Sequence, residues 1–302
     1  MIELTRKELA LRTEQRKEAI EGVLQELKKQ NDLPDQLVQL VQDIVFLHSQ
    51  ALDQNKSPLP AQEDLAEPSK HSQGLPLLPR QHFPYDKNQA EDLFFQAMQI
   101  LGNDAQHLHS ALERLQNMLS AKNIVQLEVF QAYLQDSQKA FQLWAVEFPE
   151  APGLLRFLAH SSLSPSLFNI SEYLLQFHDQ DKIWEFGYCP ICGSLPLICY
   201  LHKQGQRYGC CSFCGAQYHL PRLGCVFCGD QEAGRHDYLY AQEIPGFKLD
   251  VCQSCGNYIK TADFREMDRH YHPALDDLQS LALDLAAQEK GYARPTFSAW
   301  GF

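Results

Sequence analysis

Four C-x-x-C pairs decide the fold of this chain: Cys189-Pro190-Ile191-Cys192, Cys211-Ser212-Phe213-Cys214, Cys225-Val226-Phe227-Cys228 and Cys252-Gln253-Ser254-Cys255. Two residues between paired thiols let one tight turn direct both sulfurs at a single ion. A glycine follows each pair and relaxes the backbone so that amides can point at the sulfurs; these glycines are Gly193, Gly215, Gly229 and Gly256. Each pair, called a knuckle here, predicts half of a tetrahedral four-sulfur site suited to zinc or to a single iron ion.

The spacing between knuckles predicts how they combine into two sites. Eighteen residues separate the first knuckle from the second, 10 separate the second from the third, and 23 separate the third from the fourth. If the knuckles pair in sequence order, each site is closed by an interval long enough for the strands of a zinc ribbon. A crossed pairing is the alternative, and it needs a more complex path of the chain. The predicted metal ligands are Cys189, Cys192, Cys211 and Cys214 in the first site, and Cys225, Cys228, Cys252 and Cys255 in the second.

Four thiolates saturate an ion and leave no position for water or substrate, so such sites contribute folding energy rather than Lewis-acid catalysis. Iron would add a one-electron couple, and the spacing does not distinguish iron from zinc. The two remaining cysteines, Cys199 and Cys210, are predicted to be small buried thiols. Nearby histidines could substitute as ligands, but eight paired thiolates make them unnecessary; they are His202, His219, His236, His270 and His272.

Charge and the N-terminal sequence limit the function classes. The net charge is −12, and residues 183–272 carry 8 Lys/Arg against 9 Asp/Glu, so the cysteine-rich part has no basic patch for nucleic acid or anionic membrane. Residues 1–8 are charged and lack the features of a signal peptide, and no apolar run is long enough to span a membrane. We therefore expect a cytoplasmic protein, whose reducing surroundings favour metal sites over disulfides.

The sequence before Trp184 predicts helices. A first helix is indicated by an apolar stripe at three- and four-residue steps, formed by Leu37, Leu40, Val41, Ile44, Val45 and Leu47. A second is expected to begin at Asp86, with Gln89 completing a capping box. In a later helix Ser164 is the expected N-cap and Pro165 the first helical residue. Residues 54–84, rich in Pro, Ser, Gln and Gly, are expected to form a long surface loop that is either mobile or partner-binding.

The whole pattern predicts an α+β fold. We expect a helical domain over 1–182, two small rubredoxin-like modules of the zinc-ribbon type over 183–222 and 223–272, and a C-terminal helix and tail over 273–302. The sequence contains no G-x-S-x-G, no phosphate-binding glycine loop and no H-E-x-x-H, so no catalytic residues are predicted and an enzyme is not expected.

Several segments resemble one family, the FdhE formate dehydrogenase accessory proteins. Residues 187–196 are similar to the family's C-P-x-C-G-S-x-P opening, and residues 207–219 to its second knuckle. The similarity continues, in the same order, through residues 222–228 and 252–260 and the tail 284–294, and upstream through residues 74–78 and 164–167. One departure is Tyr218, where the family commonly has tryptophan; exchange of one aromatic residue for another changes little.

This resemblance implies a cytoplasmic maturation factor for respiratory formate dehydrogenases. The family resembles rubredoxin in its knuckles and is associated with iron, so two mononuclear iron sites are implied, with zinc as the alternative. The implied partner is the catalytic subunit, a molybdenum- or tungsten-containing selenoenzyme, before its export. A rubredoxin-like electron-transfer or redox-sensing protein is the second reading, and a nucleic-acid-binding zinc ribbon, which the missing basic patch argues against, is the third. The sequence leaves the oligomeric state open, a homodimer included.

Overall fold

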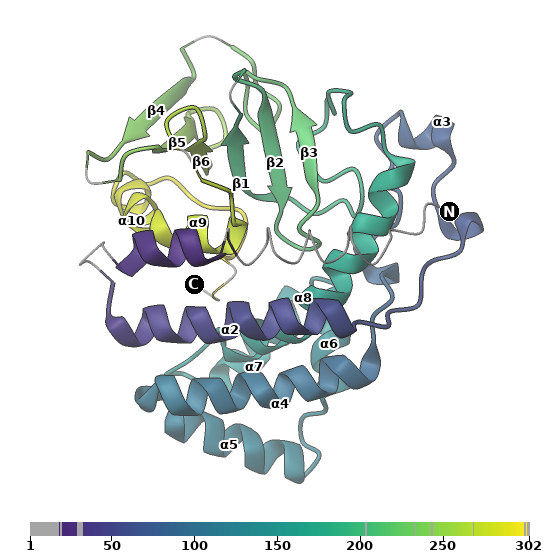
Figure 1. Cartoon of the computed structure of the whole chain (residues 1–302), viewed down its shortest axis with the longest axis vertical. Helices are drawn as coiled ribbons and strands as arrows, with labels where there is room; N and C mark the ends of the chain where they lie inside the picture. The colour runs from purple at the N-terminus through teal and green to yellow at the C-terminus, as the bar shows by residue number, and fades with distance from the viewer. Residues whose placement is uncertain are drawn as a thin grey trace. The chain divides into compact units, whose positions relative to one another are not determined.

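The computed structural model describes residues 18, 20–28, 33–202, 204–232, 234–242, 244–267, 269–298 and 300 (Figure 1). The chain forms two compact units that interleave in sequence: unit 1 is Met1–Lys56, Tyr85–Ser166 and Arg269–Leu275, and unit 2 is Ser57–Pro84, Leu167–Asp268 and Asp276–Phe302. The predicted α+β class is confirmed, with helices in the N-terminal part, a sheet that carries two four-cysteine clusters, and C-terminal helices. The division of the chain at residues 182, 222 and 272 stays a prediction.

Among the described residues, no helix is both long and apolar enough to cross a membrane.

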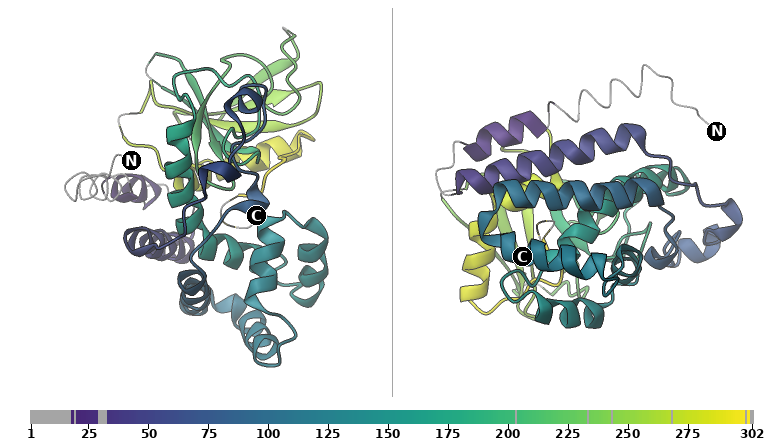
Figure 2. Two further views of the ribbon diagram at one scale, coloured as in Figure 1. Left: turned by 90° about the vertical axis from the view of Figure 1, so that its right-hand side faces the viewer. Right: turned by 90° about the horizontal axis from the view of Figure 1, so that it is seen from below.

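Unit 1 is built from helices. They are α2 (Asp35–Gln54), α4 (Lys87–Asp104), the 3₁₀ turn η3 (Gln106–Leu108), α5 (His109–Ser120), α6 (Gln126–Leu134), α7 (Gln138–Glu147) and the first part of α8 (Leu154–Leu174). Helices α2 and α4 lie side by side (Figures 1 and 2), and Leu47, Ala51 and Leu93 form a core cluster between them. The stripe predicted for the first helix is confirmed, since Val41 and Ile44 are buried.

The capping box predicted at the start of α4 is only half formed. The Asp86 carboxylate accepts the Gln89 backbone N–H at 3.1 Å, as expected of the N-cap. The Gln89 side chain does not return to Asp86; it donates to the Ala51 carbonyl of α2 at 2.8 Å. The Asp86 N–H instead donates to the Ser166 hydroxyl at 3.1 Å. The Asp86 N–H therefore bonds to a residue distant in sequence, Ser166, in place of the nearby Gln89 side chain.

Helix α8 overturns the predicted start at Ser164 and Pro165. The helix continues through Pro165, and the Ser164 hydroxyl donates to the carbonyl four residues earlier at 2.7 Å rather than capping a new helix. A proline inside a helix leaves the carbonyl four residues before it, here that of Ser161, without its N–H donor. Burial lowers the pKa of the His48 imidazole to about 4. A hydrogen bond from His48 to the Ser161 backbone acts in the opposite direction and raises that pKa, as expected when the imidazole donates to the free carbonyl. Packing thus tolerates a residue that local rules assign to a helix start.

Unit 2 contains one six-stranded sheet in the order β3-β2-β1-β6-β5-β4. The strands are β1 (Pro196–Leu201), β2 (Arg207–Cys211), β3 (Gln217–Leu220), β4 (His236–Tyr240), β5 (Phe247–Cys252) and β6 (Tyr258–Asp263). Every neighbouring pair is antiparallel except β1 and β6, which run parallel. Each half of the sheet repeats the order knuckle, strand, strand, knuckle, strand. The two predicted modules are therefore joined edge to edge through β1 and β6.

Buried charges connect the sheet to the helices α9 (Pro273–Gln279) and α10 (Leu281–Glu289). Lys260 of β6 is 1% exposed, and its Nζ lies 2.7 Å from an Asp277 carboxylate oxygen and 2.5 Å from one of Asp284. Arg294 contacts the same two carboxylates at 2.5 and 3.4 Å. Burial raises the pKa of Asp277, but Lys260 and Arg294 outweigh it and hold that pKa below its usual range. Leu283 and Ala287 of α10 join the apolar core on the sheet.

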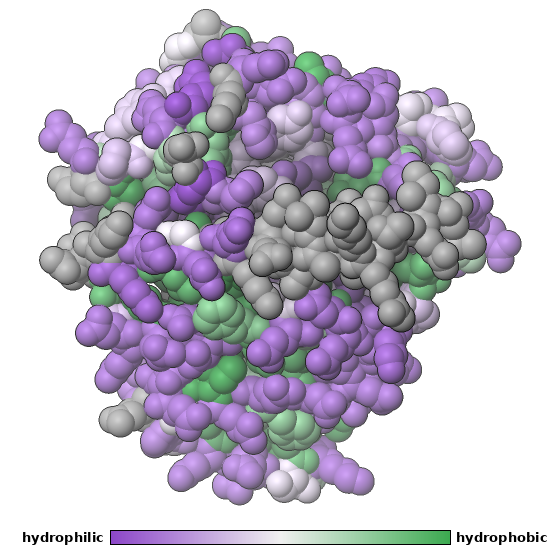
Figure 3. Space-filling model, viewed as in Figure 1, coloured by the Kyte–Doolittle hydropathy of each residue, from purple (hydrophilic) through white to green (hydrophobic). Residues whose placement is uncertain are grey.

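Unit 2 also holds short elements before and after α8. They are η1 (Gln62–Asp64), α3 (Pro68–His71) and η2 (Arg80–His82) upstream, and η4 (Leu175–Phe177) downstream. Hydrophilic residues cover most of the face seen in Figure 3, with smaller hydrophobic groups between them.

Candidate metal centres

The four knuckles share one backbone conformation. In each, the N–H of the first cysteine donates to the carbonyl five residues later, and the N–H of the glycine donates back to that cysteine's carbonyl, at distances of 2.8 to 3.2 Å. The glycines after the pairs have φ values of +82°, +71°, +73° and +70°, a left-handed conformation that favours glycine. The sequence C-x-x-C-G therefore encodes the turn locally, as the spacing predicted.

The first cluster unites the first two knuckles, in sequence order. Its four sulfurs lie within 4.8 Å of one another, with Cys189 Sγ 3.8 Å from Cys214 Sγ and Cys192 Sγ 3.3 Å from Cys211 Sγ. All four side chains are buried. The Ser171 hydroxyl, at the end of α8, donates to the Cys214 carbonyl at 2.8 Å and anchors the second knuckle.

The second cluster unites the third and fourth knuckles. Cys225 Sγ lies 3.7 Å from Cys255 Sγ, and Cys228 Sγ lies 3.7 Å from Cys252 Sγ. Only Cys252 is buried; Cys225 and Cys255 are half-buried and Cys228 is exposed. The two clusters thus have the same ligands and the same local turns but differ in access to solvent.

The donor set fits a tetrahedral ion. Zinc–sulfur bonds of about 2.3 Å place neighbouring sulfurs about 3.8 Å apart in a tetrahedron, close to the distances in both clusters. A disulfide would need about 2.05 Å. Backbone amides also approach the sulfurs, with Ile191 N 3.4 Å from Cys189 Sγ and Phe227 N 3.4 Å from Cys225 Sγ. Amides in these positions stabilise thiolates, the form that binds metal.

The electrostatics of the first cluster also favour a cation. Burial raises the pKa of Cys189 and of Cys214 well above the usual thiol range. Burial acts on Cys211 in the same direction, but hydrogen bonds from the other three thiols outweigh it and bring the Cys211 pKa well below that range. Cys211 is thus stabilised as the thiolate, whereas charging Cys189 and Cys214 is costly. A bound divalent ion removes the cost of charging the others, so binding releases protons.

Residues 57–84 lie largely on the surface, as expected, with most of residues 58–75 exposed, but the end of the segment forms a clamp over the first cluster. Leu77 N donates to the Pro190 carbonyl at 2.9 Å, Leu78 N to the Ile191 carbonyl at 2.9 Å, and further along the segment Arg80 N reaches the Cys192 carbonyl at 3.2 Å. The Arg80 guanidinium lies 4.3 Å from the ring centre of Phe213, inside the second knuckle. This segment, called the clamp below, satisfies the backbone of one knuckle and covers the other.

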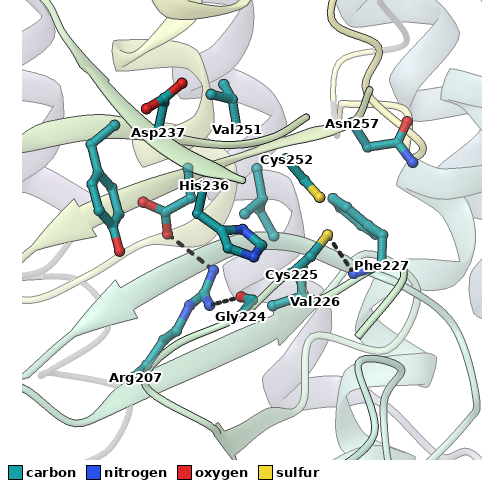
Figure 4. A pocket seen from close by; sticks show the side chains of 13 residues that line it. Arg207, Gly224, Cys225, Val226, Phe227, His236, Asp237, Val251, Cys252 and Asn257 are labelled. Atoms are coloured by element: carbon teal, nitrogen blue, oxygen red, sulfur yellow. Dashed lines mark hydrogen bonds and ion pairs between the residues drawn. The ribbon is translucent and has the colours of Figure 1, made fainter. Parts of the chain in front are cut away.

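A buried arginine joins the first half of the sheet to the second cluster. Arg207 of β2 donates to the Gly224 carbonyl and to Asp250 Oδ2, both at 3.0 Å. Gly224 precedes Cys225, so Arg207 fixes the entry to the third knuckle. Figure 4 shows the guanidinium in the pocket beside Cys225.

The other predicted residues fall into two groups. Cys199 and Cys210 are buried outside both clusters, as predicted, and Cys210 Sγ contacts the Gly215 carbonyl at 3.6 Å. His219 stacks on Tyr208 away from the sulfurs. His236 is the exception: a ring nitrogen, the Cys252 sulfur and a carboxylate oxygen of Asp230 lie within 4.8 Å of one another. Its pairing with Cys252 across β4 and β5 could be found only from the strand register.

The chain thus carries, on one sheet, two four-cysteine clusters of the knuckle type that are suited to binding a metal ion. Residues 188–222 match the family model described as FdhE, central domain, and residues 223–300 the one described as FdhE, C-terminal domain. Residues 188–300 are therefore similar to the central and C-terminal domains of the FdhE family.

Relatives and a solved structure agree with this similarity. The chain is 33% identical over 153 residues to Protein FdhE homolog of Aquifex aeolicus (strain VF5), which covers 49% of this chain and 53% of that protein. It is 34% identical over 118 residues to Protein FdhE of Escherichia coli O9:H4 (strain HS), 38% of each. The chain thus spans about half the length, or less, of the curated relatives it matches. The crystal structure of the FdhE protein from Pseudomonas aeruginosa has a TM-score of 0.62 at 24% identity over 95% of both chains, which shows a shared fold.

Proposed function

We propose that this protein is a cytoplasmic accessory factor for the maturation of respiratory formate dehydrogenase. It binds the catalytic subunit of that enzyme and holds one iron ion, or alternatively one zinc ion, in each four-cysteine cluster. The observation that carries the proposal is the pair of closed clusters within the segments that match the FdhE central and C-terminal domains. Eight thiolates fill every position around two ions, which leaves none for substrate. The role is therefore exerted on a protein partner rather than on a small molecule.

Co-purification tests the partner. The tagged catalytic subunit would be prepared in two forms, a cofactor-free precursor and the mature enzyme, and each would be mixed with the metal-loaded chain and run on a sizing column. We expect a complex with the precursor and little or none with the mature enzyme, because an accessory factor has to leave its product. Equal binding to both forms, or binding to neither, would contradict the maturation role.

A rubredoxin-like redox function is the second candidate, favoured by the amide contacts to sulfur and by the partial exposure of the second cluster. Hydrogen bonds to sulfur and solvent access set the potential of iron–thiolate centres. Visible spectroscopy of the purified chain separates the two metals, since a ferric four-sulfur site absorbs strongly and a zinc site is colourless. A colourless chain with two zinc ions would end the redox proposal and leave the accessory proposal standing.

A further inference from the structure

The second cluster has a neighbouring nitrogen ligand. His236 of β4 pairs directly with Cys252 of β5 in the antiparallel ladder. Residues opposed in this way share a face and have Cβ atoms about 5 Å apart. Figure 4 shows His236 and Cys252 among the residues that line one pocket. No histidine, aspartate or glutamate joins the first cluster in the part of the chain that the structure describes.

The His236 imidazole is available for coordination. Its Nε2 atom is buried and has no hydrogen-bond partner among the described residues, an arrangement that proteins usually avoid. Asp230, the other group nearby, is already engaged: its carboxylate accepts from the Ser254 hydroxyl and from the Glu232 amide, the latter at 2.8 Å. His236 is therefore the neighbour that can bind an ion without losing an existing contact of its Nε2 atom.

The hairpin of β4 and β5 holds His236 beside Cys252, one of the four cysteines of the second cluster. Gln253, which follows Cys252, donates hydrogen bonds to both neighbours of His236. Its N–H donates to the Arg235 carbonyl at 2.9 Å, and its side chain donates to Asp237 at 2.6 Å. In a tetrahedral site a ligand nitrogen and a ligand sulfur lie about 3.6 Å apart. The ring nitrogen is already within 4.8 Å of the Cys252 sulfur, so it has to approach that sulfur by at most about 1.2 Å. The sulfurs of Cys225 and Cys255 do not group with His236 within 4.8 Å, so the imidazole has to move further towards them.

One thiol of the second cluster is also the natural one to leave. Cys228 is exposed, whereas every thiol of the first cluster is buried. Protons, competing thiols and a protein partner reach an exposed ligand first. The second cluster therefore differs from the first in two ways: one of its sulfurs is accessible to solvent, and a histidine nitrogen lies near another of its sulfurs.

We propose that His236 is a reserve ligand for the metal ion of the second cluster. With a metal ion bound, the lone pair of a His236 nitrogen would fill the position that the Cys228 sulfur leaves with its electron pair. The ion would then have three sulfur ligands and one nitrogen ligand, nothing would be oxidised or reduced, and the released thiolate would take a proton from water or bind a partner. The second cluster is thus exchangeable while the first stays closed. This inference rests on the proposed function, because it requires the clusters to hold metal.

Cobalt substitution tests the proposal. The full chain would be stripped of metal and titrated with Co²⁺ as wild type, as Cys228→Ala, as His236→Ala and as the double variant. Alanine is chosen at position 228 because a serine hydroxyl could itself bind the ion. The buried first cluster is present in all four proteins and serves as the internal control for folding, together with circular dichroism.

We expect two Co²⁺ ions per chain in wild type and in His236→Ala, with the same all-sulfur spectrum. Cys228→Ala should also bind two, with ligand-field bands shifted by the change of one sulfur to nitrogen. The double variant should bind the second ion at least about tenfold more weakly than Cys228→Ala. The proposal fails if Cys228→Ala already binds only one ion, or if the double variant binds as tightly as Cys228→Ala. A wild-type chain that binds fewer than two ions would contradict the proposed function instead.

Discussion

Two glycines at equivalent knuckle positions provide a matched test of the clamp. Gly193 ends the first knuckle and Gly229 ends the third, with φ values of +82° and +73°. A Cβ added at Gly193 would lie 2.9 Å from Cγ of Pro76 in the clamp, whereas one added at Gly229 meets nothing within 4 Å. Substitution by alanine therefore applies the same backbone change at both sites and a clash at only one.

The expected magnitudes follow from these two contributions. An alanine in the left-handed region costs about 1–2 kcal/mol, and this applies to both variants. Overpacking against a neighbour fixed to the backbone adds about 1–3 kcal/mol, and this applies to Gly193→Ala only. We expect Gly193→Ala to be less stable than Gly229→Ala by about 1–3 kcal/mol.

Denaturant unfolding of the metal-loaded chain measures the difference in the free energy of unfolding. Limited trypsin digestion gives a local readout, because Lys70 and Arg80 lie in the clamp. Cleavage at these residues should be faster in Gly193→Ala and unchanged in Gly229→Ala. Equal stabilities and equal cleavage would contradict this prediction, since they would mean that the clamp does not press on the first knuckle.

Three further predictions concern other parts of the molecule. Cys211→Ser should lose one metal ion and keep the other, measured by elemental analysis; loss of both would indicate coupled clusters. Lys260→Ala should destabilise the chain by about 3–5 kcal/mol in denaturant unfolding, because it leaves buried carboxylates with too little positive charge, while the exposed Lys70→Ala should change stability by less than about 0.5 kcal/mol. Burial lowers the pKa of His48 to about 4 and of His160 to about 3, so both stay neutral in the fold while the unfolded chain takes up protons below its ordinary value near 6.5. Stability should therefore fall as the pH drops from about 6.5 towards 4, and a flat profile for wild type in urea unfolding over that window would contradict this.

The cysteine sites could be predicted because their geometry is local. A knuckle is five residues, C-x-x-C-G, and its turn depends on the spacing of two sulfurs and on one glycine. The grouping in sequence order required only that each interval contain a hairpin. The α+β class followed for the same reason, since helical periodicity ends where the dense Gly, Cys and Tyr sequence begins.

The clamp could not be predicted because its partners are distant in sequence. Leu77 and Leu78 bond to backbone carbonyls more than 100 residues later, and composition carries no signal for a contact with main-chain atoms. The helix start predicted at Pro165 was wrong for a related reason. The carbonyl that this proline leaves without a donor is bonded by His48, which lies on another helix. His236 required the register of β4 against β5, which neither periodicity nor spacing specifies.

The metal content of the purified chain, together with X-ray absorption at the metal edge, would show whether each cluster holds an ion in a four-sulfur site. We expect two ions per chain, each surrounded by four sulfurs at about 2.3 Å. One ion or none, or a first shell dominated by nitrogen or oxygen, would contradict this expectation.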